Sequence, residues 1–393
     1  MFHVKHHMGE DWQEGGFALY IHWPYCKAKC PYCDFNSHVT AKIDQDAWRE
    51  AYLQELDRAA TETGGRILRS VFFGGGTPSL MDPATVDAIL DRVSKHWRLT
   101  NDPEITLEAN PTSVEAARFA AYRHAGVNRV SLGLQALNDQ DLRRLGRQHS
   151  AADGLAALDL ARSLFDRTSC DLIYARQDQD LASWGEELRH VLSRGPDHIS
   201  LYQLTIEEGT AFARLYDAGK LHGLPDEDLA ADMYDLTTEL CAEAGLLGYE
   251  VSNYAKPGAE SRHNQVYWRM GDYLGIGPGA HGRLTLNGHR LATVAHRSPD
   301  LWREAVRKNG TGEAPREAIA PEDQAAEYLM MSLRLTEGMS LARYSAMLGR
   351  APDAAKLAML EQDGFIIQDQ GWLRATQSGR LLLNRLILEI SEA

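Results

Sequence analysis

The stretch Cys26-Lys-Ala-Lys-Cys30-Pro-Tyr-Cys33 follows closely on the apolar run Ala18–His22 and sets three cysteines at C-x3-C-x2-C spacing. Thiolates are the usual protein ligands of iron–sulfur clusters. A cubane cluster has four irons, so three close cysteines would hold three corners and leave one iron open to another molecule. The spacing therefore predicts a [4Fe-4S] site whose open corner is available for chemistry.

A zinc site is the alternative interpretation of the same cysteines. Zinc takes four ligands in a tetrahedron, and His22 or His38 could supply the fourth. Zinc modules usually contain two separated ligand pairs, whereas Cys170 and Cys241 lie far away in regular-looking segments, where we expect buried thiols. The spacing favours the iron–sulfur cluster.

Composition limits the classes of partner and location. The 393 residues can bury a large core and predict two or three structural units. Acidic residues (55) exceed basic ones (41), and no strongly basic stretch stands out, so a nucleic-acid partner is not expected. No apolar run reaches the roughly 20 residues that cross a bilayer, and the N-terminus lacks the apolar core of a signal peptide. Clustered free cysteines fit a reducing compartment, so we expect a cytoplasmic protein.

Strand-like and helix-like segments alternate along the N-terminal half of the chain. Amphipathic stretches separate short apolar runs, as where Val86, Ile89 and Val93 fall on one helical stripe. Repeated βα units of this kind predict a parallel sheet. The strand-like runs are Ala18–His22, Ser70–Phe73, Ile105–Leu107, Val130–Leu134, Ser169–Tyr174 and Ile199–Leu204.

Polar or glycine-rich residues follow these runs, and ligands gather at the carboxyl ends of strands in α/β barrels. Gly74–Gly76 could form only a tight turn, or could let a ligand approach the backbone and bond to its N–H groups. Glu108 and Asp171 interrupt apolar strands, which is costly unless each carboxylate faces water, a cation or hydroxyl donors. The candidate strand-end residues are Gly74–Thr77, Glu108, Gln135, Arg147, Asp171, Tyr202, Gln203 and Thr205.

The cysteine spacing, the preceding Tyr20-Ile-His-Trp-Pro-Tyr-Cys26 and the following Asp34-Phe35 resemble the radical S-adenosylmethionine (SAM) superfamily. The chain is similar to the coproporphyrinogen III dehydrogenase-like branch of that superfamily, and within it to the haem chaperones. The resemblance covers most of the chain and implies an open, partial (β/α)6 barrel able in principle to cleave SAM reductively. It implies that Cys26, Cys30 and Cys33 hold the cluster, and that SAM chelates the open iron.

The resemblance also implies SAM contacts at individual positions of this sequence. One segment departs from the family: after Asp171–Tyr174 a turn with glycine or proline is common, whereas this chain has Ala175–Gln179. Thr205 and His281 match in a more loosely aligned part. The residues that match SAM contacts are Tyr20, Tyr32, Gly75, Gly76, Thr77, Glu108, Gln135, Arg147 and Asp171.

Phe35 separates two functions within the branch. The dehydrogenases carry a fourth cysteine at this position, two residues after the third, and the chaperone-like members lack it. A phenyl ring can neither ligate iron nor relay a proton. Phe35 therefore favours a haem chaperone over an oxygen-independent coproporphyrinogen III dehydrogenase, which decarboxylates its substrate by radical chemistry. A radical enzyme acting on another substrate is a third alternative.

A second motif, His263-Asn-Gln-Val-Tyr267-Trp268, lies beyond the barrel and resembles a His-Asn-x-x-Tyr-Trp motif that is implicated in haem binding in the chaperone branch. Imidazole is a common axial ligand of haem iron, and aromatic rings can pack on the macrocycle. The haem candidates are therefore His263, Tyr267 and His281. The alternative is a histidine that is hydrogen-bonded within a structural hairpin. His3, His6 and His7 could bind metal or haem, or could belong to a mobile tail.

The last part of the chain is predicted to be a winged-helix-like α+β module. Pro315–Pro321 marks its boundary, and a hairpin around Asp369–Gly371 precedes a helix over Ser378–Ile390. The acidic balance argues against DNA binding and favours a cover over the barrel mouth or a protein contact. The predicted units are an N-terminal tail (1–16), the barrel (17–225), an extension with the haem-type motif (226–314) and the winged-helix-like domain (315–393).

These observations and the resemblance predict an α/β protein that binds a [4Fe-4S] cluster, SAM and haem. It would deliver haem to acceptor proteins, expected among the haemoproteins of the respiratory chain. A reductant for the cluster is a further expected partner. We also expect a homodimer, and peripheral contact with the inner face of the membrane.

Overall fold

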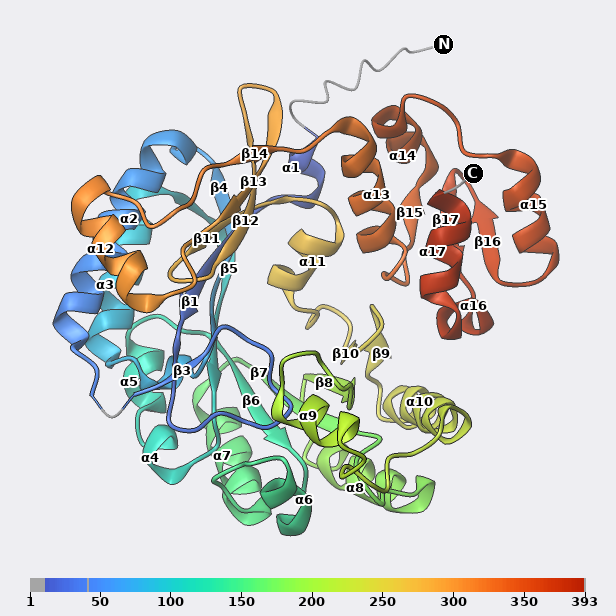
Figure 1. Cartoon of the computed structure of the whole chain (residues 1–393), viewed down its shortest axis with the longest axis horizontal. Helices are drawn as coiled ribbons and strands as arrows, with labels where there is room; N and C mark the ends of the chain where they lie inside the picture. Colours follow the sequence, from blue (N-terminus) through green and yellow to red (C-terminus); the bar gives the residue numbers. More distant parts are fainter. Residues whose placement is uncertain (1–10, 41, 392–393) are drawn as a thin grey trace.

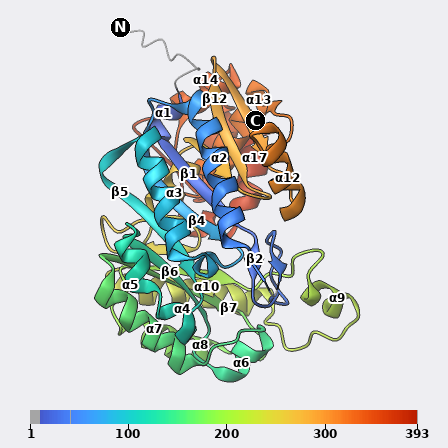
Figure 2. The ribbon, with the colours of Figure 1, turned by 90° about the vertical axis from the view of Figure 1, so that its left-hand side faces the viewer.

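One large sheet organises the chain in the computed structural model, which describes residues 11–40 and 42–391 (Figures 1 and 2). Its strands lie in the order β14-β13-β12-β11-β1-β4-β5-β6-β7-β8-β10-β9. From β11 to β8 all neighbours pair in parallel, and the strands at both ends pair antiparallel. The predicted α/β class with a parallel sheet is confirmed.

Every predicted barrel strand is present. The strands are β1 (Phe17–Trp23), β4 (Ile67–Gly75), β5 (Arg98–Ala109), β6 (Arg129–Gln135), β7 (Arg167–Tyr174) and β8 (His198–Gln203). Parallel neighbours need a crossover, and helices on the outer face of the sheet supply it (Figure 2). These helices are α2 (Gln45–Thr63), α3 (Pro83–His96), α4 (Ser113–Ala116), α5 (Phe119–His124), α6 (Asp139–Arg144), α7 (Ala151–Leu164) and α8 (Leu181–Leu192).

The barrel interior is polar, although α/β barrels usually fill it with branched apolar side chains. Alternate residues of a strand point to one face, and on β5 to β8 that face lines cavities instead of a packed core. The apolar core lies instead between the sheet and its outer helices, where Leu107, Val130 and Leu172 are fully buried. The inward-facing residues are Thr106, Glu108, Arg129, Ser131, Ser169, Asp171, His198, Ser200 and Tyr202.

Beyond β8 the chain closes the open side of the barrel (Figure 1). The run Gly248–Tyr254 turns back on itself, and its two ends lie in a short antiparallel pair. The buried Glu250 causes this turn, because it accepts hydrogen bonds from the Ser252 N–H and the Asn253 amide. The elements are α9 (Ala211–Asp217), α10 (Glu227–Glu243), β9 (Leu247–Gly248), β10 (Asn253–Ala255), α11 (Arg262–Trp268), β11 (Asp272–Ile276), β12 (His281–Leu286), β13 (His289–Val294), α12 (Pro299–Asn309) and β14 (Glu317–Ala318).

The C-terminal module has its own apolar core, which includes Leu329, Leu373 and Leu386. The helix expected over Ser378–Ile390 is divided at Leu382 into α16 and α17. The wing-like hairpin is confirmed as β16 paired with β17. The module contains α13 (Pro321–Ser332), β15 (Met339–Ser340), α14 (Leu341–Leu348), α15 (Ala354–Gln362), β16 (Ile366–Asp369), β17 (Trp372–Ala375), α16 (Gln377–Leu381) and α17 (Leu383–Ser391).

The interpretation of this module as a cover over the barrel mouth is wrong. It lies beside α11, away from the cysteine loop (Figures 1 and 2), and none of its residues described up to 391 lines the cavities at the strand ends and inside the barrel. Met270 joins its core, and Ser332 donates a hydrogen bond to the Trp268 carbonyl. Arg343 adds an ion pair with Asp11. Apolar contact with the end of α11 therefore decides where the module sits.

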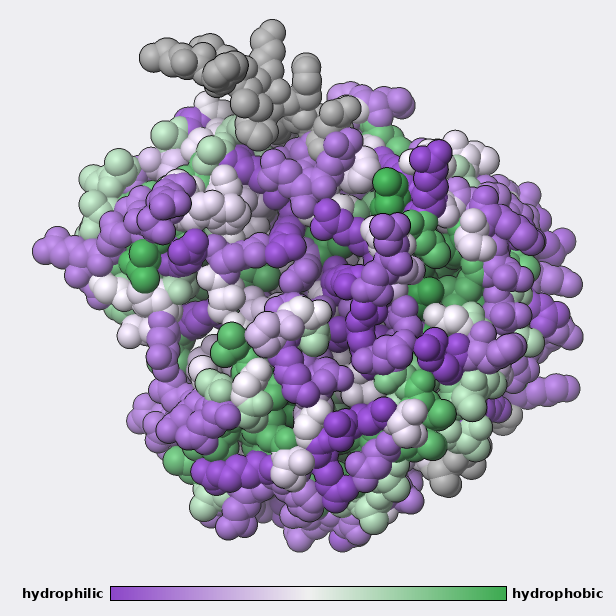
Figure 3. All heavy atoms as spheres, turned by 180° about the vertical axis from the view of Figure 1, so that it is seen from behind, coloured by the Kyte–Doolittle hydropathy of each residue, from purple (hydrophilic) through white to green (hydrophobic). Residues whose placement is uncertain are grey.

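The surface seen from behind is mostly hydrophilic, with hydrophobic side chains between in small groups (Figure 3). Among the described helices, none has both the length and the apolar character needed to span a bilayer. His3, His6 and His7 lie outside the described residues.

Glu55 gives a prediction for the stability of this fold. The side chain is 2% exposed, and its Oε1 accepts a hydrogen bond of 2.9 Å from the Gly312 N–H. Burial raises the pKa of Glu55 from 4.5 to about 7. Folding therefore favours the protonated acid, and this stabilisation is complete at low pH and is lost as the pH rises through about 7.

We expect Glu55→Gln to remove this dependence, since the amide keeps the shape and cannot ionise. Relative to the variant, the wild type should lose roughly 2 kcal/mol of unfolding free energy between pH 5.5 and 8. Urea denaturation at both pH values measures this. If the unfolding free energies of wild type and Glu55→Gln differ by the same amount at pH 5.5 and at pH 8, the raised pKa of Glu55 is contradicted.

Candidate functional site

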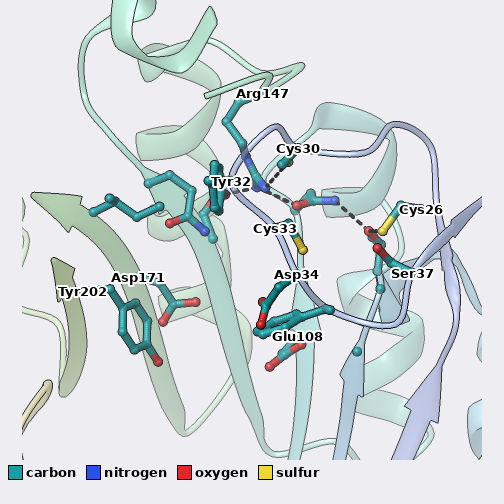
Figure 4. Close-up of a pocket in the computed structure, with 18 of the residues that line it drawn as sticks. Cys26, Cys30, Tyr32, Cys33, Asp34, Ser37, Glu108, Arg147, Asp171 and Tyr202 are labelled. Carbon is teal, nitrogen blue, oxygen red and sulfur yellow. Dashed lines mark hydrogen bonds between the residues drawn. The ribbon is translucent and has the colours of Figure 1, made fainter. Parts of the chain in front are cut away.

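The carboxyl ends of the barrel strands meet the cysteine loop in a pocket of about 620 Å³ (Figure 4). The structure brings nearly all of the predicted strand-end and SAM-contact residues together here. Gly74, Tyr20 and His281 are the exceptions. The predicted residues that line the pocket are Cys26, Cys30, Tyr32, Cys33, Gly75, Gly76, Thr77, Glu108, Gln135, Arg147, Asp171, Tyr202, Gln203 and Thr205.

The cysteine loop has little secondary structure of its own. A short parallel ladder joins β2 (Tyr25–Cys26) to β3 (His38–Val39). The Asn36 amide donates to the carbonyls of Pro278 and Arg297, both at 2.9 Å, which fastens the loop to the segments that follow β11 and β13. Lys29 closes the loop by donating to the Phe35 carbonyl and the Ser37 hydroxyl.

The three cysteines are free, half-buried thiols that line the pocket together. Burial raises the pKa values of Cys26 and Cys33, which disfavours bare thiolates there. Bound iron would stabilise the thiolates, because metal ligation removes the proton. Three sulfurs beside a pocket that has room for a further ligand fit a [4Fe-4S] cluster with one open iron.

The zinc alternative loses one of its candidate ligands. Both ring nitrogens of His22 are engaged, Nδ1 with the Tyr20 hydroxyl at 3.0 Å and Nε2 with the Asn36 carbonyl at 2.9 Å. Burial lowers the pKa of His22 to about 4, so the ring is a neutral bridge between β1 and the cysteine loop. His22 therefore supports the loop and is not free to bind a metal ion.

The glycines after β4 allow close packing. Gly75 has φ +110°, and a Cβ at Gly76 would lie 2.7 Å from the Tyr25 carbonyl oxygen. The Gly76 N–H already donates to the Trp23 carbonyl, and the Thr77 N–H to the Tyr25 carbonyl. The Gly76 N–H, one of those that could have bonded to a ligand, is therefore occupied, because the first strand and the cysteine loop take up these two N–H groups.

Two half-buried carboxyl groups form the floor of the pocket. Burial, together with the nearby Asp171, raises the pKa of Glu108 to about 8. Burial raises the pKa of Asp171 to about 6, while the Ser200 and Ser131 hydroxyls oppose the rise. Near neutral pH the pair therefore holds about one negative charge, and can both accept and donate hydrogen bonds to a polar ligand.

Gln135 presents a free acceptor beside them. Its φ of +66° follows an irregularity in the pairing of β6 with β7, and its Oε1 is buried without a partner. A buried polar atom is costly unless something bonds to it, so this oxygen calls for a donor on a ligand.

The segment Ala175–Gln179 replaces the expected glycine or proline turn with a buried arginine. Arg176 forms ion pairs with Glu187 at 2.5 Å and Asp141 at 3.1 Å. Ala175 and Asp178 adopt positive φ angles. The ion pairs of Arg176 stabilise a backbone conformation with positive φ angles, which glycine adopts more easily than other residues.

A second cavity of about 220 Å³ lies inside the barrel, and Glu108, Ser131, Asp171 and Tyr202 line both cavities. Tyr20 lines this inner cavity and not the outer pocket. Its place on β1, two residues before His22, turns it into the barrel interior.

Helix α11 places the His-Asn-x-x-Tyr-Trp motif against this inner cavity. His263 is 1% exposed and stacks on Phe72. Its Nδ1 bonds with the Ser70 hydroxyl at 2.9 Å and its Nε2 with the Tyr267 hydroxyl at 2.6 Å. Burial lowers the pKa of His263 to about 3, so the ring is neutral. The hydrogen-bonded structural histidine is thus the arrangement observed, and His281 lies exposed on β12.

Sequence reasoning missed Asn110, Ser131 and Ser37 as pocket residues. Ser131 could have been found, because it lies two residues before Gly133 on the inward face of β6. Asn110 directly follows the end of β5 and lies two residues after Glu108, so strand alternation places it on the same face as the chosen Glu108. Ser37 gave no signal, since only the folded loop turns it toward the cysteines.

Comparison with known proteins agrees with this geometry. Residues 20–189 match the model of the radical SAM superfamily, and residues 319–382 match that of the HemN C-terminal domain. The chain is 40% identical to "Radical S-adenosyl methionine domain-containing protein 1, mitochondrial" of Bos taurus, covering 95% of this chain and 87% of that protein. It is 38% identical to "Heme chaperone HemW" of Escherichia coli (strain K12), covering 94% of this chain and 97% of that protein.

A solved structure shares the fold along nearly the whole chain. Coproporphyrinogen III oxidase (HemN) from Escherichia coli superposes with a TM-score of 0.80, covering 96% of this chain and 90% of that one. The two sequences are 23% identical, so this likeness concerns the architecture alone.

We expect Cys30→Ser to lose the iron–sulfur cluster, because a hydroxyl is a poor substitute for a thiolate ligand. Iron and acid-labile sulfide contents after anaerobic reconstitution measure the loss. Cys170→Ala is the matched control, since Cys170 is a buried thiol outside the pocket. Contents equal to wild type in Cys30→Ser would refute the site.

Proposed function

The chain belongs to the radical SAM superfamily, and we propose that within it this protein is a haem chaperone. It binds haem together with a [4Fe-4S] cluster and SAM, and transfers haem to acceptor haemoproteins. The observation that carries the proposal is the likeness to "Heme chaperone HemW" of Escherichia coli over nearly the full length of both chains.

Phe35 supports the same function from the site itself. Its side chain is 58% exposed and lines the pocket beside Cys33 and Asp34. A phenyl ring offers neither a sulfur ligand nor a transferable proton. An exposed phenyl ring at the pocket wall can pack against a hydrophobic ligand or partner.

The proposed roles follow the pocket walls. Cys26, Cys30 and Cys33 would hold the cluster, which would supply one-electron chemistry at this end of the pocket. The remaining wall holds SAM: Glu108 and Asp171 suit its hydroxyl and ammonium donors, and Arg147 suits its carboxylate. Tyr32, Gly75, Gly76, Thr77 and Gln135 complete this wall, and Tyr20 would act from the inner cavity.

The haem site is proposed on α11 with His263 as iron ligand. Binding requires Ser70 or Tyr267 to release the ring, because together they occupy both ring nitrogens. Tyr267 and the exposed His281 are the other candidate ligands. The proposal extends to a cytoplasmic protein that acts at the inner membrane face, takes electrons from a separate reductant, forms a homodimer and delivers haem to respiratory proteins.

Oxidative decarboxylation of coproporphyrinogen III is the second candidate function, favoured by the shared architecture with HemN. Anaerobic incubation of the reconstituted protein with coproporphyrinogen III, SAM and dithionite tests it. We expect no decarboxylated product from protein with a fully loaded cluster. Stoichiometric or greater product would establish an enzyme and overturn the chaperone proposal.

Opposite effects are expected from two substitutions in α11. His263→Ala should weaken haem binding about tenfold or more by removing the iron ligand. Tyr267→Phe should strengthen it, since the ring that remains keeps its packing but no longer competes for Nε2. Haem titration followed at the Soret band measures both. Unchanged affinity in His263→Ala would exclude this histidine, and weaker binding in Tyr267→Phe would point to Tyr267 as the ligand.

A further inference from the structure

A chain of hydrogen bonds joins two of the cluster cysteines across the pocket wall, and dashed lines in Figure 4 follow it between Arg147 and Cys26. Arg147 donates from Nη1 to Cys30 Sγ at 3.7 Å and from Nη2 to Asn110 Oδ1 at 2.5 Å. Asn110 Nδ2 donates to Thr77 Oγ1 at 3.1 Å, and Thr77 Oγ1 donates to Cys26 Sγ at 3.4 Å. Two side chains thus connect the arginine to a second thiol.

The direction of every bond in this chain is fixed. A guanidinium group has only donors, so the atom of Asn110 that faces Arg147 must be the amide oxygen. The NH2 group then faces Thr77, whose oxygen accepts this bond. The Thr77 hydroxyl proton is thereby left for the Cys26 sulfur.

The residues of the chain are held rigidly before any cluster binds. Thr77 precedes Pro78 and Asn110 precedes Pro111, and a following proline restricts the backbone to extended conformations. The Asn110 N–H also bonds to the buried Glu115 carboxylate at 3.1 Å. Thr77 is almost fully buried, so water does not compete for its hydroxyl. These groups are therefore preorganised toward the sulfurs.

We propose that Asn110 and Thr77 are positioning residues that carry the influence of Arg147 to Cys26 and so set the reduction potential of the cluster. Hydrogen bonds to cluster sulfurs are among the factors that tune such potentials. Reduction adds one electron and makes the sulfurs more negative. A donor aimed at a sulfur therefore stabilises the reduced form, and its removal makes reduction harder.

This inference depends on the family's cluster and not on the proposed haem transfer. The test is a redox titration of the reconstituted protein without SAM, following the signal of the reduced cluster by electron paramagnetic resonance. Thr77→Val removes the hydroxyl and keeps the shape. We expect its midpoint potential to become more negative, with about tenfold less reduced cluster at a fixed potential, which is about 59 mV for one electron. Thr77→Ser, which keeps a hydroxyl, should stay near the wild-type value.

Asn110 is tested by Asn110→Asp, which still accepts from Arg147 but has no donor for Thr77. The Thr77 hydroxyl would then turn toward the new carboxylate, so the potential should again become more negative. Asn110→Leu removes both bonds without adding charge. Its effect combined with Thr77→Val should be less than the sum of the two, because both interrupt one chain. Thr106→Val is the matched control, since Thr106 Oγ1 is buried, unpartnered and lines only the inner cavity.

Equal midpoint potentials in wild type, Thr77→Val and Thr77→Ser would overturn the proposal. A shift in Thr77→Val with none in Asn110→Leu would refute the role of Asn110. Should Thr77→Val fail to assemble a cluster, the titrations of the two Asn110 variants decide in its place. A failure of haem transfer with the predicted shifts intact would reject the chaperone proposal alone.

Discussion

The position of the cysteine loop depends on the parallel pairing of β1 with β4 on one side and β11 on the other. β1 leads directly into the loop, so the registers Ile21↔Phe73 and Ile21↔Ile276 decide how far the loop projects beyond the sheet. β11 comes about 250 residues later in the chain, and the nearby carbonyls of Pro278 and Arg297 hold Asn36. The loop has almost no internal structure, so contacts with residues distant in sequence fix its position. A cluster with three neighbouring ligands requires such a fixed loop.

The polar barrel interior is the second consequence of this architecture. Buried polar groups are costly when unpaired, and Thr106, Gln135 and His198 each keep a buried atom without a partner. Stability therefore rests on the apolar layer between the sheet and the outer helices. The interior is left free to hold ionisable and hydroxyl groups next to the cysteines, and Glu108 and Asp171 acquire raised pKa values there. The unpaired atoms are the part of the site that a polar ligand would complete.

Much of this could be predicted from the chain alone. The six strands and the buried thiols at Cys170 and Cys241 follow from local pattern, and all are observed. The sequence could not show where a distant group intervenes. The N–H groups of Gly76 and Thr77 are occupied by carbonyls of Trp23 and Tyr25, and Tyr20 lines the inner cavity and not the outer pocket. The C-terminal module was expected to cover the barrel mouth or to contact another protein, and it lies beside the barrel because its core packs on Met270 at the end of α11.

The sequence by itself determined the ligand types, the order of the elements and the edge of the sheet at which the site lies, because thiolate spacing and strand alternation are local properties. It also contains Phe35, the residue that favours a haem chaperone over a coproporphyrinogen III dehydrogenase. Only the tertiary structure decided which groups meet. His263 is buried and hydrogen-bonded at both ring nitrogens, because Ser70 on β4 contacts one nitrogen and Tyr267, one turn further along α11, contacts the other. The bonds from Arg147 through Asn110 and Thr77 to Cys26 exist because parallel strands bring their carboxyl ends together, whatever their separation along the chain.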